Sequence, residues 1–148
     1  ENLAKEKQLQ NVRFIDYLPR DEYEKLLRAA DVGLINLDRR LTVPAIPSKA
    51  VSYLELGIPI LASVNKFTDF GKMIEDIGAG LWCETGDLVS YKRNFDKLLT
   101  DSQLRERISK SGMTFMKDNM TVSCVFHRTL QIFSEKVPRD LKYSTKSR

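Results

Sequence analysis

The sequence predicts an α/β fold, a Rossmann-like parallel β-sheet with flanking helices. Short β-rich runs alternate with stretches of helical periodicity up to about residue 84, and only helical patterns follow. Residues 32–37 form a nearly continuous apolar run, which is typical of a strand covered on both faces. Alternation of this kind favours parallel strands joined by right-handed crossovers.

Local signals along the chain define the expected elements. β-rich runs bounded by turn residues predict the strands, and apolar residues at helical spacing predict the helices. The expected strands are residues 12–17, 32–37, 59–63 and 80–84. The expected helices, after the end of a first one within residues 1–10, begin near residue 21 and then span residues 47–56, 67–77, 88–99, 101–116 and 121–137.

Individual residues set the expected helix boundaries. Asp21 and Glu24 have the spacing of a capping box, in which each side chain accepts a hydrogen bond from the backbone at the other. Thr100 and Gln103 have the same spacing before a later helix. Gly57 is placed to end the helix before it, because glycine readily adopts the left-handed conformation found there.

Length and charge indicate one ordinary globular domain. The chain has 148 residues, of which 42% are hydrophobic and 30% charged, and no apolar run is long enough to span a bilayer. Residues 134–148 hold five basic and two acidic residues, which accounts for most of the net charge of +4. We therefore expect a domain at 1–137, a basic tail at 138–148 and no nucleic-acid partner. The tail is either solvated or in contact with anionic lipid or an acidic partner.

The cysteines and the histidine do not indicate a metal site or a nucleophile. Cys83 and Cys124 lie far apart and show no C-x-x-C or Cys/His spacing, which fits a reduced, cytoplasmic setting. His127 is the single histidine and lies in an amphipathic helical stretch without a catalytic neighbour in sequence. We expect no metal, no cofactor and a structural role for His127.

Residues 44–63 carry the clearest ligand signal. Pro47 suits the first helical position, which makes Ile46 the N-cap, and isoleucine has no side-chain acceptor for the first-turn amides. Those amides, the Ser48 hydroxyl and the Lys49 ammonium then suit a phosphate or diphosphate. The alternative is that Ser48 is itself the N-cap and Lys49 is solvated surface.

The expected architecture places this helix start where ligands bind. In parallel α/β sheets, ligands bind at the carboxyl ends of the strands. The loops expected there include residues 16–20, 38–46 and 63–67, and the helix begins directly after the second of them. The position of the helix in the fold therefore supports the same anion site.

Four stretches of the chain carry a family resemblance. They are residues 11–23 (NVRFIDYLPRDEY), 27–35 (LRAADVGLI), 47–62 (PSKAVSYLELGIPILA) and 78–84 (GAGLWCE). In this order and spacing they resemble the C-terminal, donor-binding domain of family-4 glycosyltransferases with the GT-B fold. The likeness is strongest to bacterial capsule, O-antigen and exopolysaccharide transferases whose loop reads Pro-Ser-Lys.

The resemblance implies a glycosyltransferase with a nucleotide-sugar donor, UDP-linked, and a glycan or lipid-linked acceptor held by a separate N-terminal domain. The implied setting is surface polysaccharide synthesis in the cytoplasm, with peripheral contact to the inner face of the cell membrane. By position, residues 17 and 18 would face the base, residues 46–49 the diphosphate and sugar, and residue 52 the ribose. The implied nucleotide-sugar-binding residues are Tyr17, Leu18, Ile46, Pro47, Ser48, Lys49 and Ser52.

The chain departs from the family pattern at two glutamate positions. Counted back from Gly57, these positions hold Pro44 and Ser52. Ser52 can still form one hydrogen bond to a ribose hydroxyl, without the extra strength of a charged acceptor. Pro44 cannot replace a carboxylate, and Glu55, one turn from Ser52, is expected to be solvated rather than a substitute. No catalytic residue is assigned.

A second departure concerns the start of the chain. In this fold two central strands, with the basic residues that grip the diphosphate, would precede Glu1. Without them the strand 12–17 has no neighbour on the side facing residues 32–37, and a parallel sheet does not tolerate that gap. We therefore expect an N-terminally truncated GT-B domain that rearranges, associates with another copy or is part of a larger chain.

Two other functions stay open. The chain can be a non-catalytic nucleotide- or partner-binding module derived from this fold, since both glutamates are absent. It can also be a generic phosphate-binding α/β domain, if the resemblance is coincidental.

Overall fold

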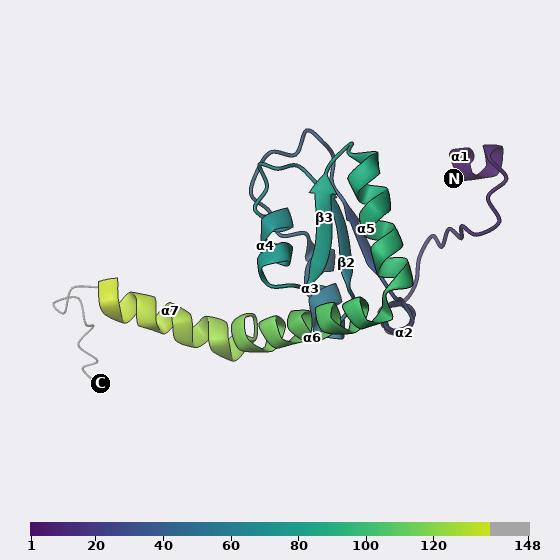
Figure 1. Ribbon diagram of the computed structural model, residues 1–148. Helices are drawn as coiled ribbons and strands as arrows, with labels where there is room; N and C mark the ends of the chain where they lie inside the picture. The colour runs from purple at the N-terminus through teal and green to yellow at the C-terminus, as the bar shows by residue number, and fades with distance from the viewer. Residues whose placement is uncertain (137–148) are drawn as a thin grey trace. The chain divides into compact units, whose positions relative to one another are not determined.

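A three-stranded parallel sheet lies at the centre of the fold (Figure 1). The computed structural model describes residues 1–136, so the expected basic tail 138–148 lies outside the described part. The strands are β1 (Gly33–Asn36), β2 (Ile60–Val64) and β3 (Gly80–Glu84), in that order across the sheet. Both neighbouring pairs are parallel, which confirms the expected α/β fold with a parallel sheet.

The chain divides into two units, Glu1–Ala30 and Asp31–Arg148, and each is described by itself. The first contains α1 (Asn2–Glu6) and α2 (Arg20–Arg28). The expected strand at residues 12–17 is wrong, because residues 12–19 adopt no regular secondary structure. Phe14 is 53% exposed and Ile15 55% exposed. An extended segment needs a neighbouring strand for its backbone groups, and the sheet of β1, β2 and β3 gives this one none.

The start of α2 differs from the expected capping box. Pro19 is the N-cap, and no side chain caps the helix. Instead of bonding back to Asp21, Glu24 accepts a hydrogen bond from Arg20, with 3.1 Å between Oε1 and Nε. This exposed pair lies one turn apart on the helix surface, where such pairs form readily and add little stability.

The described part of the second unit contains five helices. They are α3 (Ser48–Leu56), α4 (Phe70–Asp76), α5 (Leu88–Thr100), α6 (Ser102–Asn119) and α7 (Val122–Lys136). Figure 1 shows α4 and α5 on opposite faces of the sheet. Helix α3 packs on β1, and α6 packs against α3 and α5. The sheet is therefore flanked by helices on both faces, as the sequence predicts.

The core has two parts, one on each face of the sheet. On one face Leu61, Leu98 and Ile108 form a buried cluster that joins β2, α5 and α6. On the other face the ring of Tyr53 lies against Gly33, and the ring of Trp82 lies against Gly71. These glycines admit the aromatic rings because they have no side chain in the way.

Strand β1 is not covered on both faces, contrary to expectation. Its residues alternate between buried and exposed, and Leu34 is 43% exposed. The reason is its place at the edge of the sheet, where β2 is its only paired neighbour among the described strands. An edge strand shares fewer covering elements than a central one.

Other helix ends are set by single residues. Gly57 ends α3 with φ of 68°, as predicted. Asp87 caps α5 by accepting a hydrogen bond from Ser90 N at 3.0 Å. At the start of α6, Asp101 accepts from Leu104 N at 2.8 Å, so the expected box of residues 100 and 103 is wrong by one position.

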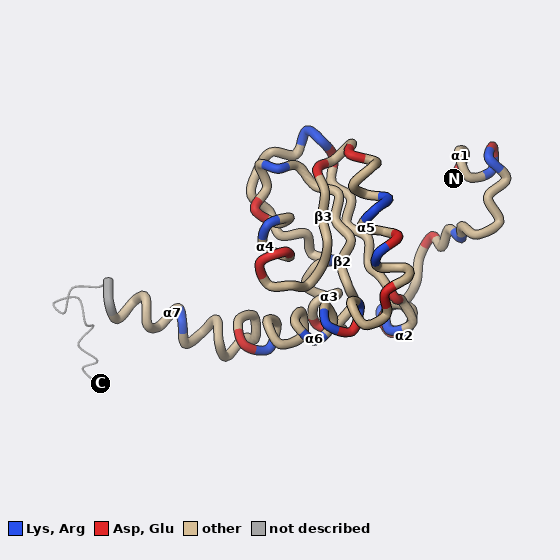
Figure 2. The backbone as a smooth tube through the Cα atoms, viewed as in Figure 1, with Lys and Arg blue, Asp and Glu red and all other residues tan. Residues whose placement is uncertain are grey.

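Charged side chains are mixed over the described part of the chain (Figure 2). Helices α4, α5 and α6 each carry an exposed pair of opposite charges one turn apart, at distances of 2.6 to 3.0 Å. Within residues 1–136 no helix is long and apolar enough to cross a membrane. The same residues contain no group of three or more metal-ligating side chains.

Candidate functional site

The start of α3 is an uncapped helix N-terminus. Its N-cap is Pro47, with ψ of 134°, so the expected N-cap Ile46 is wrong by one residue. The alternative with Ser48 as N-cap is also wrong, because Ser48 is already helical. Proline has no side-chain acceptor, and no side-chain hydrogen bond caps this end. The first-turn amides therefore present partial positive charge, which suits an anion.

Polar and cationic groups lie beside these amides. Ser48 and Lys49 are exposed, and Ser52 is half-buried one turn further along the same face. Among residues 1–136, Lys49 forms no ion pair. Its ammonium is therefore available to a ligand without first giving up an internal carboxylate partner.

This helix start lies at the carboxyl edge of the sheet. The backbone ladder continues beyond the strands, because Leu37 N donates to Ser63 O at 2.9 Å and Thr85 N donates to Val64 O at 3.1 Å. The Thr85 hydroxyl also donates to Leu37 O at 3.2 Å. These bonds tie the three strand ends together, and α3 begins at the end of the loop that leaves β1.

Two contacts order the first half of the β1–α3 loop, residues 37–47. The Asp38 carboxylate accepts hydrogen bonds from the Arg40 backbone and guanidinium at 2.8 to 3.0 Å, and the guanidinium contact holds the pKa of Asp38 below its usual range. Across the loop, Asn65 Nδ2 donates to Arg39 O at 2.8 Å. Asn65 is buried, so this bond is shielded from water.

A pocket of about 320 Å³ lies beside the second half of this loop. Its walls come from the loop and from the start of α4, namely Pro44, Ala45, Ile46, Asp69, Phe70 and Met73. Ile46, one of the implied site residues, therefore lines a pocket, and its contact with a ligand stays a prediction. Sequence patterns did not indicate Asn65, Asp69 and Met73, because their only local signal is their place after the carboxyl end of a strand.

Two of the implied site residues belong to the other unit. Tyr17 is 82% exposed and Leu18 is half-buried within Glu1–Ala30. Their role in facing the base stays a prediction. The structure brings together only the implied residues of the second unit, which are Ile46, Pro47, Ser48, Lys49 and Ser52.

Comparison with known proteins identifies the family of the chain. Residues 1–114 match the family described as glycosyl transferases group 1. The chain belongs to the group 1 glycosyltransferases. It is also 32% identical over 95 residues to a protein named probable glycosyltransferase WbjE from Pseudomonas aeruginosa. That match covers 64% of this chain and 24% of WbjE, so the chain spans about a quarter of that relative.

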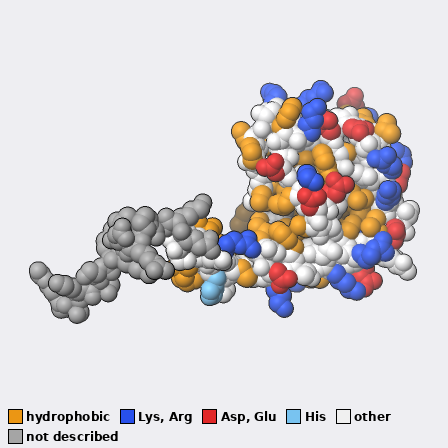
Figure 3. Space-filling model, turned by 60° about the vertical axis from the view of Figure 1, so that its left-hand side comes forward, with side chains coloured by type: hydrophobic (Ala, Val, Ile, Leu, Met, Phe, Trp, Pro, Cys, Tyr) orange, Lys and Arg blue, Asp and Glu red, His pale blue; other side chains and the backbone are white. Residues whose placement is uncertain are grey.

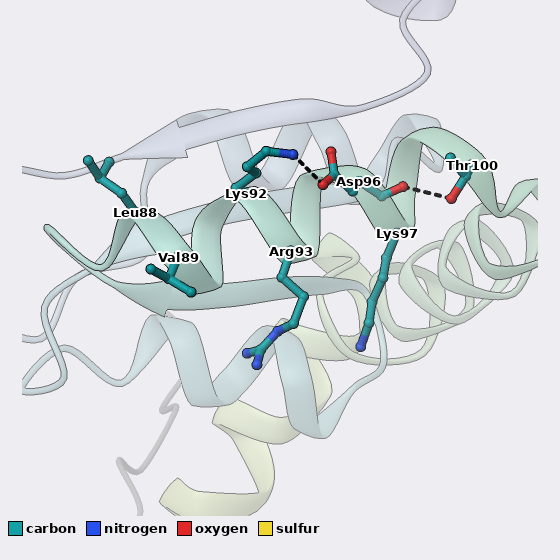
Figure 4. Close-up of a pocket in the computed structure, with 7 residues that line it drawn as sticks. All are labelled: Leu88, Val89, Lys92, Arg93, Asp96, Lys97 and Thr100. Atoms are coloured by element: carbon teal, nitrogen blue, oxygen red, sulfur yellow. Dashed lines mark hydrogen bonds and ion pairs between the residues drawn. The ribbon is translucent and has the colours of Figure 1, made fainter.

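A larger hollow on this group 1 glycosyltransferase chain is a weaker candidate. It measures about 620 Å³ and is lined by α5 alone, by Leu88, Val89, Lys92, Arg93, Asp96, Lys97 and Thr100 (Figure 4). Lys92 is already paired with Asp96 at 2.6 Å. Binding sites are concave and collect polar groups from several elements, whereas this surface is one helix face. We therefore place the site at α3.

The aromatic residues divide between surface and core. Phe67, which follows β2, is 63% exposed, and Lys66 Nζ lies 5.4 Å from its ring centroid. Phe70 is 1% exposed and belongs to the core. Trp82 is half-buried and donates from Nε1 to Glu75 Oε2 at 3.0 Å. Phe67 is thus the most exposed of the three, while Phe70 meets the pocket beside the candidate site only as part of its wall.

His127 lies beyond residues 1–114, which match the family, and its Nδ1 is 3.4 Å from the Ser123 hydroxyl. It is exposed on α7, and its Nδ1 lies 2.7 Å from the backbone oxygen of Ser123 in the preceding turn (Figure 3). Cys83 is 5% exposed, and burial raises the pKa of its thiol. A buried thiol of raised pKa is a poor nucleophile.

Proposed function

We propose that this chain is the donor-binding part of a glycosyltransferase that takes a sugar from a UDP-linked donor. The acceptor is a glycan or lipid-linked saccharide in surface polysaccharide synthesis, at the cytoplasmic face of the cell membrane. The observation that carries the proposal is the uncapped start of α3, with Ser48 and Lys49 beside it, at the carboxyl edge of a parallel sheet in a group 1 glycosyltransferase chain.

The chemistry needs positioning and charge stabilisation from these residues. The bond between the anomeric carbon and the diphosphate oxygen breaks, the acceptor hydroxyl oxygen forms the new bond, and its proton passes to the departing diphosphate. Negative charge grows on the departing diphosphate, where Lys49 and the first-turn amides of α3 stabilise it. The acceptor site and further basic groups are proposed to come from a region that precedes this domain.

The proposed donor site lacks two carboxylates that the resemblance expects to contribute to donor binding. Pro44 and Ser52 stand where the resemblance expects carboxylates. Ser52 is half-buried on the same face of α3 as Ser48, so one hydroxyl remains for the ribose. More of the affinity therefore depends on Lys49 and the helix amides than in relatives with both glutamates.

Calorimetric titration of the chain with UDP-glucose and UDP tests the proposal. We expect Lys49→Ala to weaken binding by about 10- to 100-fold, since a hydrogen bond to a charged group is worth roughly 1.5–3 kcal/mol. Lys110→Ala is the matched control, because Lys110 is an exposed lysine of α6 paired with Glu106 at 2.7 Å. No binding by wild type, or equal losses in the two variants, contradicts the proposal.

The second candidate is a non-catalytic binding module. It is favoured by the two missing carboxylates at Pro44 and Ser52. A protein that carries this domain together with its preceding region, binds UDP-glucose and neither transfers nor hydrolyses the sugar would be such a module. Measured transfer to any glycan acceptor excludes it.

Self-association is also proposed, on the evidence of unpaired surfaces. Strand β1 is an edge strand with Leu34 43% exposed, and apolar side chains of residues 12–17 are exposed in the other unit. Unpaired edges and apolar segments are templates for pairing with another chain. Light scattering of the purified chain should give a mass above 17.0 kDa, and a monomer at all concentrations would exclude this proposal.

A further inference from the structure

Asn65 joins the two loops that border the candidate site. It lies directly after β2 and is 8% exposed. Its Nδ2 donates to Arg39 O at 2.8 Å, in the loop that leads to α3. Its Oδ1 accepts from Phe67 N at 3.0 Å, in its own loop. One buried amide therefore bridges the β1–α3 loop and the β2–α4 loop.

The turn that contains Asn65, residues 65–68, is held by its own hydrogen bonds. The Asn65 backbone oxygen accepts hydrogen bonds from Thr68 N at 3.0 Å and from the Thr68 hydroxyl at 2.7 Å. Thr68 is itself 4% exposed. The turn from residue 65 to 68 is thus closed on itself, and it provides a fixed point for the longer loop opposite.

The longer loop has few other anchors. Its first half is folded back by the Asp38–Arg40 contacts and by Leu41 N, which donates to Asp38 O at 3.0 Å. These bonds lie within the loop, so they shape it without attaching it to the sheet. The loop is tied to the sheet at its first residue, because Leu37 N donates to Ser63 O and Leu37 O accepts from the Thr85 hydroxyl. Beyond Leu37, the Asn65–Arg39 bond joins residues 26 apart in sequence and attaches the loop to the turn after β2.

The pocket lies between the same two segments. Ala45 and Ile46 form one wall, just before α3, and Asp69 and Phe70 form another, just after the turn that Asn65 closes. The separation of these walls depends on how the loop is held against the turn. A loop that is ordered before the ligand arrives loses less entropy on binding, which raises affinity.

We infer that Asn65 is a positioning residue for the donor, which sets the affinity for the nucleoside diphosphate by fixing the β1–α3 loop before binding. This role rests on the proposed function of the α3 start. Asn65 touches neither the amides of α3 nor Lys49 in the structure. It acts through the loop that ends at Pro47.

The test needs variants that remove only the bridge. Asn65→Asp keeps the size of the side chain and the acceptor for Phe67 N, but it replaces the donor to Arg39 O with a carboxylate oxygen. Asn94 offers a matched control, since it is also 8% exposed and its Nδ2 donates to a backbone oxygen, that of Trp82, at 2.9 Å. Asn94→Asp therefore imposes the same chemical change at a site in α5.

Two measurements on the 148-residue chain separate the bridge from the function. Amide hydrogen exchange of residues 38–46, read without ligand, should be about three- to tenfold faster in Asn65→Asp and unchanged in Asn94→Asp, on the scale of one lost hydrogen bond. Calorimetry with UDP should show a similar loss of affinity for Asn65→Asp, with little loss for Asn94→Asp.

Each outcome decides one claim. Unchanged exchange of residues 38–46 in Asn65→Asp, or equal acceleration in both variants, overturns the positioning role even when UDP binds to wild type. Faster exchange with undiminished UDP affinity also overturns it, because the loop would then be held without consequence for the ligand. If exchange is faster in Asn65→Asp but the wild-type chain binds no UDP, the proposed function is refuted, and the positioning role with it, while the structural bridge stands.

Discussion

The contact between Gly33 of β1 and Tyr53 of α3 fixes how closely this helix lies on the sheet. A methyl group added at Gly33 would stand 2.6 Å from Cδ2 and Cε2 of the Tyr53 ring and 2.9 Å from Cγ. Carbon atoms pack at about 3.5–4.0 Å, so the ring has to retreat by roughly 1 Å. Tyr53 is 8% exposed, and the retreat therefore has to shift α3 or force the ring from its rotamer.

Gly33→Ala should therefore lower stability and donor affinity together. Overpacking a core costs about 1–3 kcal/mol, and the reduced entropy of the unfolded chain offsets only about 0.4–1 kcal/mol of it. For a chain of this size, thermal unfolding followed by circular dichroism should show a melting temperature lowered by roughly 2–8 °C. UDP affinity should fall as well, because α3 carries Ser48 and Lys49 and a shift of about 1 Å misplaces them.

A double-mutant cycle with Tyr53→Ala provides the control. In the Tyr53→Ala background there is no ring to displace, so the added methyl group should cost little or nothing. The coupling between the two substitutions should then equal most of the cost of Gly33→Ala alone. An equal cost of Gly33→Ala in both backgrounds, or an unchanged melting temperature in the single variant, would refute the reasoning.

Two further predictions concern titratable groups. The hydrogen bond from Ser90 N holds the pKa of Asp87 below its usual range. The ionised Asp87 carboxylate therefore stabilises the folded chain above the ordinary carboxyl pKa, and this stabilisation is lost as the pH falls through the lowered pKa. Urea unfolding should show Asp87→Asn less stable than wild type at neutral pH and equal to it in acid, and a difference that persists in acid contradicts this. Burial raises the pKa of the Cys83 thiol, whereas Cys124 is half-buried. Iodoacetamide at pH 8 should therefore label Cys124 much faster than Cys83 in the native chain. Equal labelling rates of the two cysteines in the native chain would show that Cys83 is accessible.

The sequence predicts well those elements whose signals are local. The third strand, residues 80–84, has the expected bounds, because glycine begins it and a turn of threonine and glycine follows it. Gly57 ends α3 as predicted, since the left-handed conformation at that position is a property of one residue. Such signals act over a few residues and need no knowledge of the rest of the fold.

The strand expected at residues 12–17 shows where local reasoning fails. Its β-rich composition is real, but a strand exists only when a neighbour accepts its backbone hydrogen bonds. The same dependence explains β1, whose apolar run suggested full burial although Leu34 is 43% exposed. Composition shows that a segment is able to form a buried strand, but the neighbouring elements determine whether it pairs and becomes buried.

The candidate site divides in the same way. Ser48 and Lys49 could be proposed from the sequence because proline, serine and lysine stand together at the start of a helix. Asn65 could not, because its role depends on Arg39, which is 26 residues away and offers only a backbone oxygen that any residue would supply. A hydrogen bond to a backbone oxygen does not depend on the type of the accepting residue, so it cannot be predicted from that residue. It becomes visible only when the positions of the two loops in the structure are known.

The structure thus separates the candidate site into a rigid part and an adjustable part. Helix α3 is rigid, because Tyr53 packs on the sheet and Leu54, 1% exposed, packs toward Gly112 of α6, where an added methyl group would stand 3.2 Å from Leu54 Cδ2. The amides and dipole at its start therefore keep a fixed direction. The loop before it is hydrogen-bonded to Ser63 and Thr85 at Leu37, and beyond Leu37 the side-chain amide of Asn65 attaches it at Arg39. Since the pocket wall at Ala45 and Ile46 belongs to this loop, a change at residue 65 can alter the shape of the pocket while α3, the helix proposed to bind the diphosphate, stays in place.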